Sequence, residues 1–206
     1  MGLLYSLDQS INIPGIISTF RALNNPRLLI PDIRAKNLNQ VYPDYLRNNR
    51  IRNVLFDMDN TLSLPYEYSL YPDIADRFNE FRARFRVAII SNSAGVPSDK
   101  GEERAKRIED AFNVHVIRHD KKKPDCIEEV LRYFVLTWDE RDAVAMIGDR
   151  VTDVVFGNSY DMFTALVEPF DLAKDNAMAR MIRPYERMLM ERAIAKYGRK
   201  EARQLP

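Results

Sequence analysis

Two aspartates, Asp57 and Asp59, stand two residues apart directly after the apolar run VLF, in the stretch LFDMDNTLSLP. Side chains two residues apart in an extended segment point to the same side, so both carboxylates can serve one site. Such a pair either forms a solvated turn or holds a metal ion and reacts with a substrate. The other polar clusters of the chain favour the second interpretation.

Three further polar clusters follow apolar runs later in the chain. SNSAG follows VAII, RHDKKKP follows VHVI, and GDRVTD follows VAMI. Together they would add a hydroxyl, a lysine and two more carboxylates. Open α/β sheets bind their ligands beyond the carboxyl ends of the strands, so we expect all four clusters to meet at one edge.

The elements that would position these clusters alternate between short β-type runs and helical patterns. In chain order they occupy residues 54–56, 73–85, 87–90, 102–112, 114–117, 126–136, 144–147 and 163–168. This alternation is typical of a parallel sheet covered on both faces. We therefore predict an α/β fold, with a Rossmann-like, doubly wound parallel sheet of about five strands.

Composition is that of a globular protein, with 46% hydrophobic and 30% charged residues in a chain of 206. One cysteine excludes an internal disulfide framework, and no apolar run approaches the roughly 20 residues that span a bilayer. Residues 1–52 carry a net charge of +4, residues 53–173 carry −8 and residues 174–206 carry +5. Basic flanks indicate an anionic surface as partner, although solvated helix faces would give the same pattern.

The motifs DMDNT, SNS, KKKP and GDRVTD resemble, in this order, the signature motifs of the haloacid-dehalogenase-like phosphohydrolase superfamily. This resemblance covers roughly residues 53–170. It implies that Asp57 is a nucleophile that forms an aspartyl-phosphate, which divides hydrolysis into two easier steps. It implies that Asp59 is the general acid and base, which protonates the leaving oxygen and then activates water.

The resemblance also implies which residues bind the phosphoryl group. Ser91 would hydrogen-bond a phosphoryl oxygen with help from Asn92, and Thr61 fits the phosphatase form of the first motif. A lysine would bridge the phosphate and the nucleophile, offsetting charge that builds in the transition state. Lys122 and Lys123 both remain candidates, and Lys123 is preferred because it directly precedes a proline.

Mg²⁺ is the implied cofactor, because it prefers carboxylate, carbonyl and water oxygens as ligands. Asp57, the backbone carbonyl of Asp59, and Asp149 match the metal ligands of the superfamily. Asp153 would hold a metal-bound water. The spacing between Asp149 and Asp153 is one residue shorter than in the capless group named next, which leaves the role of Asp153 open.

Residues 62–73 and 95–102 are too short to hold the cap domain that encloses small substrates. We therefore expect no cap and a large substrate. The stretches RHDKKKP, GNSYDMFTALVEP and DNAMARMIRPYER are similar to a capless group, the mitochondrial and plastid phosphatidylglycerophosphate phosphatases and their bacterial relatives. That group removes the terminal phosphate of phosphatidylglycerophosphate and yields phosphatidylglycerol, a precursor of cardiolipin.

A phospholipid substrate would bring a second phosphate and a membrane surface to the site. Arg118, His119, Lys121 and Arg150 are the expected contacts of the second phosphate. We expect three parts, namely an N-terminal helical and membrane-proximal extension, a phosphohydrolase core and a basic helical C-terminal segment, at residues 1–52, 53–172 and 173–206. Nucleic acid is not an expected partner, and the oligomeric state stays open.

The segment 13–30 presents an apolar helical face, formed by Ile13, Ile16, Ile17, Phe20 and Leu23. It would lie either on the membrane interface or on the core. We expect peripheral attachment on the matrix side of the mitochondrial inner membrane, with the plastid or the bacterial cytoplasm as alternatives. Two other functions stay open: a capless phosphatase for phosphoproteins or soluble phosphate esters, and a non-catalytic interaction module.

Overall fold

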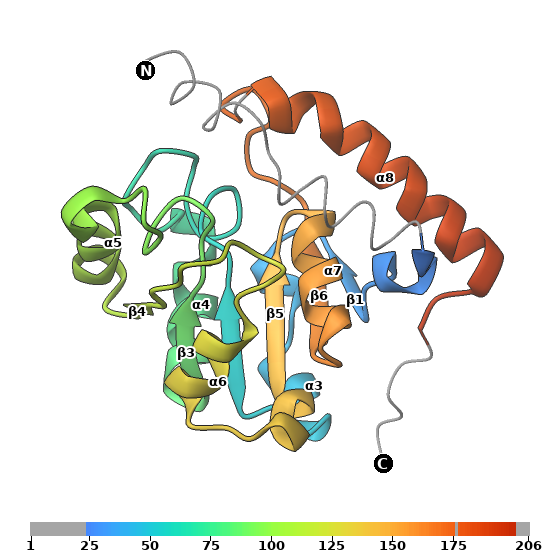
Figure 1. The fold of residues 1–206 in the computed structure, drawn as a ribbon, viewed down its shortest axis with the longest axis horizontal. Helices are drawn as coiled ribbons and strands as arrows, with labels where there is room; N and C mark the ends of the chain where they lie inside the picture. The colour runs from blue at the N-terminus through green and yellow to red at the C-terminus, as the bar shows by residue number, and fades with distance from the viewer. Residues whose placement is uncertain (1–23, 176, 201–206) are drawn as a thin grey trace.

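A computed structural model describes residues 24–175 and 177–200 of the chain. The expected apolar face up to Leu23 lies outside these residues. Figure 1 shows the elements, with 3₁₀ helices named η in the text. They are η1 (Pro26–Leu29), β1 (Ile33–Ala35), η2 (Leu38–Gln40), α3 (Pro43–Asn48), β2 (Asn53–Phe56), η3 (Pro72–Ile74), α4 (Ala75–Arg84), β3 (Arg86–Ile89), η4 (Lys100–Glu102), α5 (Glu103–Phe112), β4 (His115–Val116), α6 (Ile127–Phe134), η5 (Trp138–Ala143), β5 (Val144–Gly148), α7 (Val151–Ser159), β6 (Phe163–Val167) and α8 (Ala177–Tyr197).

The sheet has six parallel strands in the order β1-β6-β5-β2-β3-β4. The predicted parallel α/β fold is confirmed, with one strand more than expected. The additional strand is β1, which pairs with β6 at Ile33↔Ala165 and forms an edge of the sheet. With only three residues, β1 is too short to give a periodic signal in the sequence.

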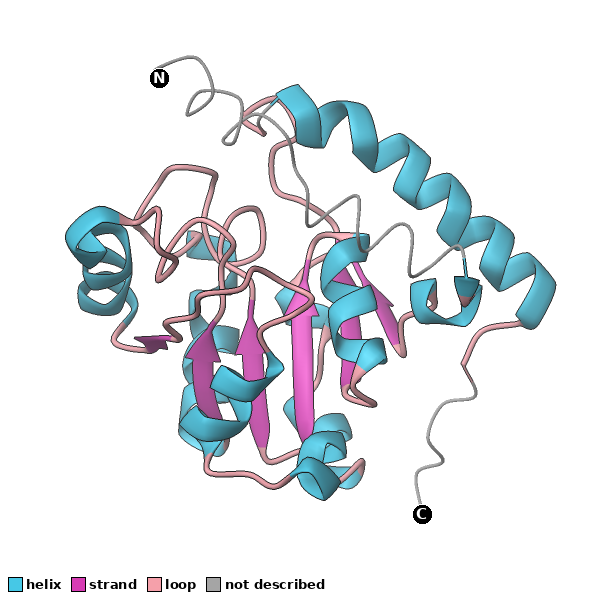
Figure 2. Ribbon diagram, viewed as in Figure 1, coloured by secondary structure: helices cyan, strands magenta, loops and turns pink. Residues whose placement is uncertain are grey.

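Both faces of the sheet are covered by helices, as Figure 2 shows. Successive residues of a strand point to opposite faces, and β2 therefore divides its side chains between two cores. Phe56 packs with Phe78 and Phe81 of α4 on one face, while Leu55 packs with Val130 of α6 on the other. Because all four residues of β2 are buried, the strand reads as a continuous apolar run rather than an alternating one.

The C-terminal helix α8 runs without a break through Pro184. A proline inside a helix removes one backbone hydrogen bond, so the helix needs support from its surroundings. Met190 and Ala193 supply part of it by packing against a small core that includes Leu29 and Ile30. These two residues of the segment 13–30 therefore belong to the core. No described helix is long and apolar enough to cross a membrane.

The carboxyl ends of the strands point to one edge of the sheet, which is visible from the arrowheads in Figure 2. Only loops and single 3₁₀ turns follow β2 and β3 before α4 and α5 begin. Over the contiguous described residues 24–175, neither connection holds an inserted cap domain. Among the described residues, no cap covers the edge with the polar clusters, and α8 lies beside it (Figure 1).

Candidate active site

The four polar clusters meet at the carboxyl edge of the sheet. Asp57 directly follows β2, Ser91 follows β3, Lys123 lies between β4 and α6, and Asp149 follows β5. All four side chains line one pocket of about 690 Å³. The sheet places them there because the ends of β2, β3 and β5 are neighbours in its strand order.

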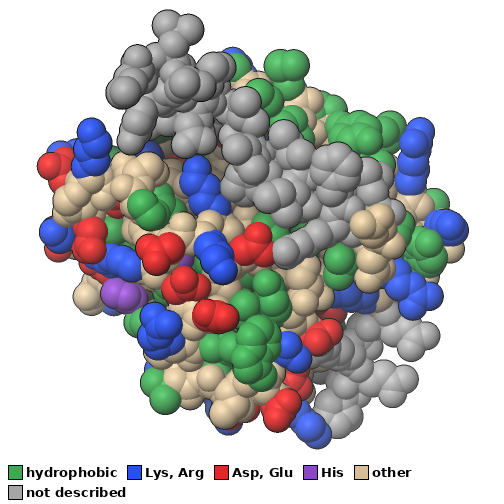
Figure 3. All heavy atoms as spheres, viewed as in Figure 1, with side chains coloured by type: hydrophobic (Ala, Val, Ile, Leu, Met, Phe, Trp, Pro, Cys, Tyr) green, Lys and Arg blue, Asp and Glu red, His purple; other side chains and the backbone are tan. Residues whose placement is uncertain are grey.

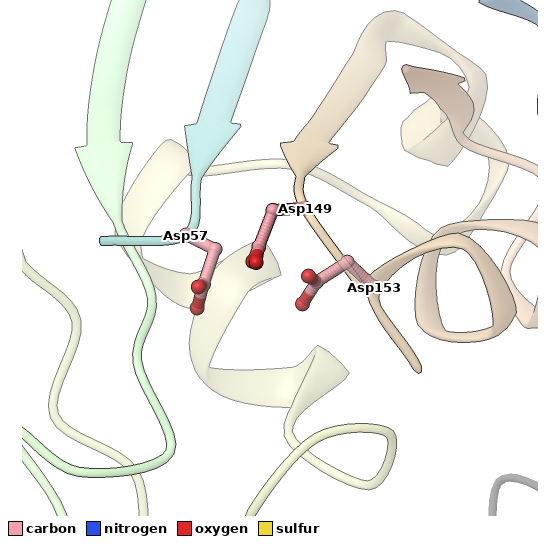
Figure 4. A group of neighbouring side chains, drawn as sticks. All are labelled: Asp57, Asp149 and Asp153. Atoms are coloured by element: carbon pink, nitrogen blue, oxygen red, sulfur yellow. The ribbon is translucent and has the colours of Figure 1, made fainter. Parts of the chain in front are cut away.

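Three carboxylates converge inside the pocket. Asp57, Asp149 and Asp153 each offer an oxygen, and these atoms lie within 4.8 Å of one another. Figure 4 shows the three side chains pointing toward one another from the ends of β2 and β5 and from the first turn of α7. An oxygen-only donor set of this kind suits a hard divalent cation.

Gly148 makes the approach of Asp153 possible. A Cβ atom at this position would lie 2.3 Å from Asp153 Oδ2. Any other residue would therefore displace the carboxylate from its place beside Asp149. The close contact with Asp153 therefore explains on steric grounds why the GDRVTD motif begins with glycine.

Lys123 bridges two of the carboxylates. Its Nζ lies 2.7 Å from Asp57 Oδ1 and 2.5 Å from Asp153 Oδ1, and its side chain is only 2% exposed. Burial lowers the pKa of Lys123, but the two carboxylates outweigh burial and hold the pKa above its usual value. The Asn92 side chain accepts a hydrogen bond of 2.9 Å from the Lys123 backbone N–H and so fixes the lysine's loop. Lys122 lines the pocket but is exposed, so the geometry favours Lys123 as the bridging lysine.

Burial disfavours the charged forms of the carboxylates in the site. The pKa of Asp57 is raised to about 8, mainly by burial, with Lys123 opposing and Asp153 and Asp149 reinforcing the shift. The pKa of Asp149 is raised to about 6, again mainly by burial, although Arg183 opposes it. A cation among these oxygens would return both groups to their charged forms.

Asp59 faces the pocket beside the serines of the SNSAG loop. Its Oδ2 accepts a hydrogen bond of 3.4 Å from Ser93 Oγ, which lies 3.0 Å from Ser91 Oγ. Burial raises the pKa of Asp59, opposed by the Tyr66 backbone N–H and by Arg104. A carboxyl with a raised pKa keeps its proton longer, as a general acid requires.

Thr61 lies behind the carboxylates. It is buried, and its Oγ1 donates a hydrogen bond of 3.4 Å to Asp149 Oδ1. It is not among the described residues that line the pocket. Its place suits the support of Asp149 better than the contact with substrate that we expected.

Three of the residues expected to bind a second phosphate do not line the pocket: Arg118, His119 and Lys121. Arg118 forms ion pairs with Glu102 and Glu109 at the edge of the sheet. His119 is buried, with ring nitrogens 2.9 Å from Ser91 O and 2.7 Å from Lys121 O. Arg150, the fourth expected contact, does line the pocket, and its Nη2 lies 3.0 Å from Glu186 Oε1.

Sequence analysis missed a basic residue that α8 brings to the site. Arg183 Nη2 lies 2.5 Å from Asp149 Oδ2, and its Nη1 donates a hydrogen bond of 3.0 Å to the Asp149 backbone carbonyl. Its Nε lies 2.6 Å from Asp175 Oδ2. Arg183 and Glu186 lie three residues apart on one face of α8, but only the structure shows that both form ion pairs with the GDR stretch.

Residues 13–169 match the model of the mitochondrial phosphatidylglycerophosphate (PGP) phosphatase family. The chain belongs to this family. Phosphatidylglycerophosphate phosphatase 1, chloroplastic/mitochondrial, of Arabidopsis thaliana is 34% identical over 197 residues, which are 93% of this chain and 56% of the relative. The chain thus spans little more than half the length of this plant relative.

Shorter relatives of the family match over most of their length. Phosphatidylglycerophosphatase GEP4, mitochondrial, of Saccharomyces cerevisiae is 34% identical over 154 residues, 72% of this chain and 82% of the yeast protein. The probable phosphatase YqeG of Bacillus subtilis is 26% identical over 168 residues, 80% of this chain and 91% of the bacterial protein. Each of these two matches covers more than two thirds of this chain.

Proposed function

We propose that this protein is a Mg²⁺-dependent phosphatidylglycerophosphate phosphatase, which removes the terminal phosphate and yields phosphatidylglycerol. Membership of the family gives the substrate class. The observation that carries the chemistry is the lysine-bridged pair of Asp57 and Asp153 in an open pocket. Asp57 in this pocket can contact a phosphate monoester without the opening of a cap.

The reaction would proceed in two displacements at phosphorus. The Asp57 carboxylate attacks phosphorus, the bond to the ester oxygen breaks, and Asp59 gives its proton to the departing glycerol oxygen. Water then attacks the aspartyl-phosphate, Asp59 takes a proton from that water, and inorganic phosphate leaves with Asp57 regenerated. Lys123 and the Ser91 hydroxyl would hold the phosphoryl oxygens, where negative charge builds in both steps.

The residues present fit a magnesium ion. Asp57, Asp149 and the Asp59 backbone carbonyl would hold it, and Asp153 would complete the oxygen-rich surroundings. Once bound, the ion would neutralise the negative charges of the nucleophile and of the phosphate. The raised pKa of Asp57, about 8, supports this assignment, since a site without added positive charge disfavours the ionised nucleophile.

A membrane-facing surface would present the lipid to the pocket. The side chains Met178, Met181, Tyr185 and Met188 follow helical spacing and are exposed, Met181 by 76%. Met178 and Met181 also line the pocket. Figure 3 shows hydrophobic side chains gathered along the edge of the molecule that α8 occupies in Figure 1.

We place this stripe of α8 on the surface of an anionic membrane, with basic residues of the C-terminal segment beside it. Exposed Arg180 and Arg187 belong to the same helix, and each Lys or Arg near anionic lipid contributes on the order of 1 kcal/mol. Attachment would be peripheral, on the matrix side of the mitochondrial inner membrane or its counterpart in plastids or bacteria. The mitochondrial and chloroplastic names of the relatives support an organelle as the location.

Phosphate release from phosphatidylglycerophosphate vesicles tests the proposed function. We expect turnover with Mg²⁺ and none after chelation. Ca²⁺ should fail to restore it, because calcium takes more ligands at longer distances. Preference for a phosphopeptide or for a soluble phosphate ester over these vesicles would contradict the substrate assignment and favour the alternative phosphatases.

Membrane docking is tested separately with the double variant Tyr185→Gln, Met188→Gln. It should weaken vesicle binding and vesicle turnover while hydrolysis of p-nitrophenyl phosphate persists, because neither residue lines the pocket. Trp138→Gln is the control, since Trp138 is an equally exposed aromatic residue at the amino end of β5. Equal loss of both activities with a lower melting temperature would show that the stripe is structural.

A further inference from the structure

Three described arginines line the pocket, and one of them has no carboxylate partner among the described residues. Arg104 lines the pocket from the first turn of α5, on the side of the SNSAG loop. Its guanidinium Nε is buried and has no hydrogen-bond partner. Among the described residues it forms no ion pair, whereas Lys123, Arg150 and Arg183 in the same pocket are each paired with a carboxylate.

The position of Arg104 is fixed by the loop that carries Ser91. Asp99 Oδ1 accepts a hydrogen bond of 3.0 Å from the Arg104 backbone N–H. Asp99 Oδ2 accepts two more, each 3.0 Å long, from the N–H groups of Gly95 and Ala105. One carboxylate thus joins the SNSAG loop to the start of α5 and leaves the arginine side chain directed to the pocket.

The charge of Arg104 acts close to the reacting groups. It lines the same pocket as Asp57 and Asp59. An unpaired guanidinium beside the general acid is a receptor for an anion, because its N–H groups form a fork that matches two oxygens of a phosphate. Leaving the buried Nε–H of Arg104 without an acceptor is costly.

Resting on the proposed function, we infer that Arg104 binds the phosphodiester of the substrate while the terminal phosphate lies at Asp57. The two phosphates of the headgroup are separated by a single glycerol, so the second must bind within the same pocket. Arg118, His119 and Lys121 lie outside that pocket, and Arg150, which lines it, is paired with Glu186. Arg104 would therefore distinguish a substrate with two phosphates from a simple monoester.

The test compares two soluble substrates, which removes membrane docking from the measurement. They are the deacylated headgroup, with both phosphates, and p-nitrophenyl phosphate, with one. We expect Arg104→Ala to lower the ratio of their kcat/KM values by about 10- to 100-fold, mainly through KM for the headgroup. Arg107→Ala is the matched control, because Arg107 is exposed on the same helix, with its guanidinium 5.8 Å from the centre of the Tyr68 ring.

An unchanged ratio in Arg104→Ala, with a wild-type melting temperature, would overturn the inference while leaving the proposed function intact. If the alanine variant fails to fold, Arg104→Lys replaces it in the same measurement. Lysine keeps the charge but loses the fork, so the ratio should fall in the same direction by a smaller factor. A wild-type enzyme that releases no phosphate from phosphatidylglycerophosphate would overturn both the proposed function and the subsite.

Discussion

The two walls of the pocket are held in different ways. On the sheet side, Asp57 and Asp149 directly follow strands whose backbones are bonded to neighbours on both sides. On the other side, α8 reaches the pocket through Arg183, bound to Asp149, and through Glu186, bound to Arg150. The first wall is fixed by backbone hydrogen bonds, whereas the second depends on side-chain charge.

This difference links the second wall to the chemistry. Arg183 binds the Asp149 carboxylate, which is also a proposed ligand of Mg²⁺. A change in the charge of Asp149 therefore alters the contact that holds α8, but not the strand that precedes Asp149. The sheet supplies a rigid base for the reacting groups, and α8 supplies a wall that responds to their charge state.

Asp57→Asn should have the largest effect on activity. The amide keeps the size of the side chain but removes the nucleophile, so turnover should fall by at least about 10⁴-fold. The fold should persist, because the sheet wall depends on backbone bonds. Phosphate release and circular dichroism measure the two properties. Residual turnover above a trace would show that Asp57 is not the nucleophile.

Asp59→Asn should lower kcat/KM by about 10²- to 10⁴-fold, the range for loss of a general acid. Burial raises the pKa of Asp59, and the proton-donating form is present below this pKa and lost as pH rises through it. The wild-type pH profile should therefore fall on its alkaline side. If kcat/KM of the variant falls at alkaline pH in the same way as that of the wild type, a group other than Asp59 is the general acid.

Arg183→Met sharpens the comparison between the two walls. It leaves the buried Asp149 carboxylate without its partner, which should cost on the order of 3 kcal/mol of unfolding free energy. Displacing a group that orients a metal ligand should also lower activity or Mg²⁺ affinity by about 10- to 100-fold. Chemical denaturation and magnesium titration by calorimetry give the two values.

Arg187→Met is the control, one turn further along α8. Its partner Glu168 is 3.8 Å away, and both side chains are 59% exposed. Loss of such a pair should cost less than about 1 kcal/mol. If the two variants behaved alike, α8 would be a structural helix with no share in the site.

Asp99→Ala should cost less than Arg183→Met, about 0.5–2 kcal/mol of unfolding free energy, because Asp99 accepts hydrogen bonds from N–H groups at the start of α5 as a helix cap does. Burial alone would raise the pKa of Asp99, but the N–H groups of Gly95, Arg104 and Ala105 outweigh it and lower the pKa. The stabilisation is therefore present above the unfolded pKa of about 3.9 and is lost as pH falls through the lower folded value. Denaturation should show that the difference in unfolding free energy between the wild type and Asp99→Ala is smaller at a pH below the folded pKa of Asp99 than at neutral pH. A constant difference would contradict this role of Asp99.

The strand-end groups could be predicted from the sequence because each follows an apolar run in a regular α/β alternation. Asp57, Ser91, Lys123 and Asp149 were found in this way, and the pocket brings them together. Strand β1 was not predicted, because three residues are too few to show the alternation of apolar and polar residues that indicates a strand.

The basic residues around the site could not be sorted from the sequence alone. Arg104 and Arg183 lie in helices and Arg118 follows β4, and only the packing decides which of them face the pocket. Arg118 forms ion pairs with Glu102 and Glu109, while Arg183 forms one with Asp149, 34 residues away in the sequence. Long-range pairing of this kind leaves no local pattern.

The most direct test of the account is to look for phosphate on the nucleophile. The enzyme would be mixed with phosphatidylglycerophosphate and Mg²⁺, quenched in acid during turnover and digested for mass spectrometry. We predict that the peptide containing Asp57 gains the mass of one phosphoryl group, and that the Asp57→Asn variant gains none. Phosphate on a different side chain, or an unmodified peptide under conditions where hydroxylamine releases phosphate from the quenched protein, would contradict Asp57 as the nucleophile.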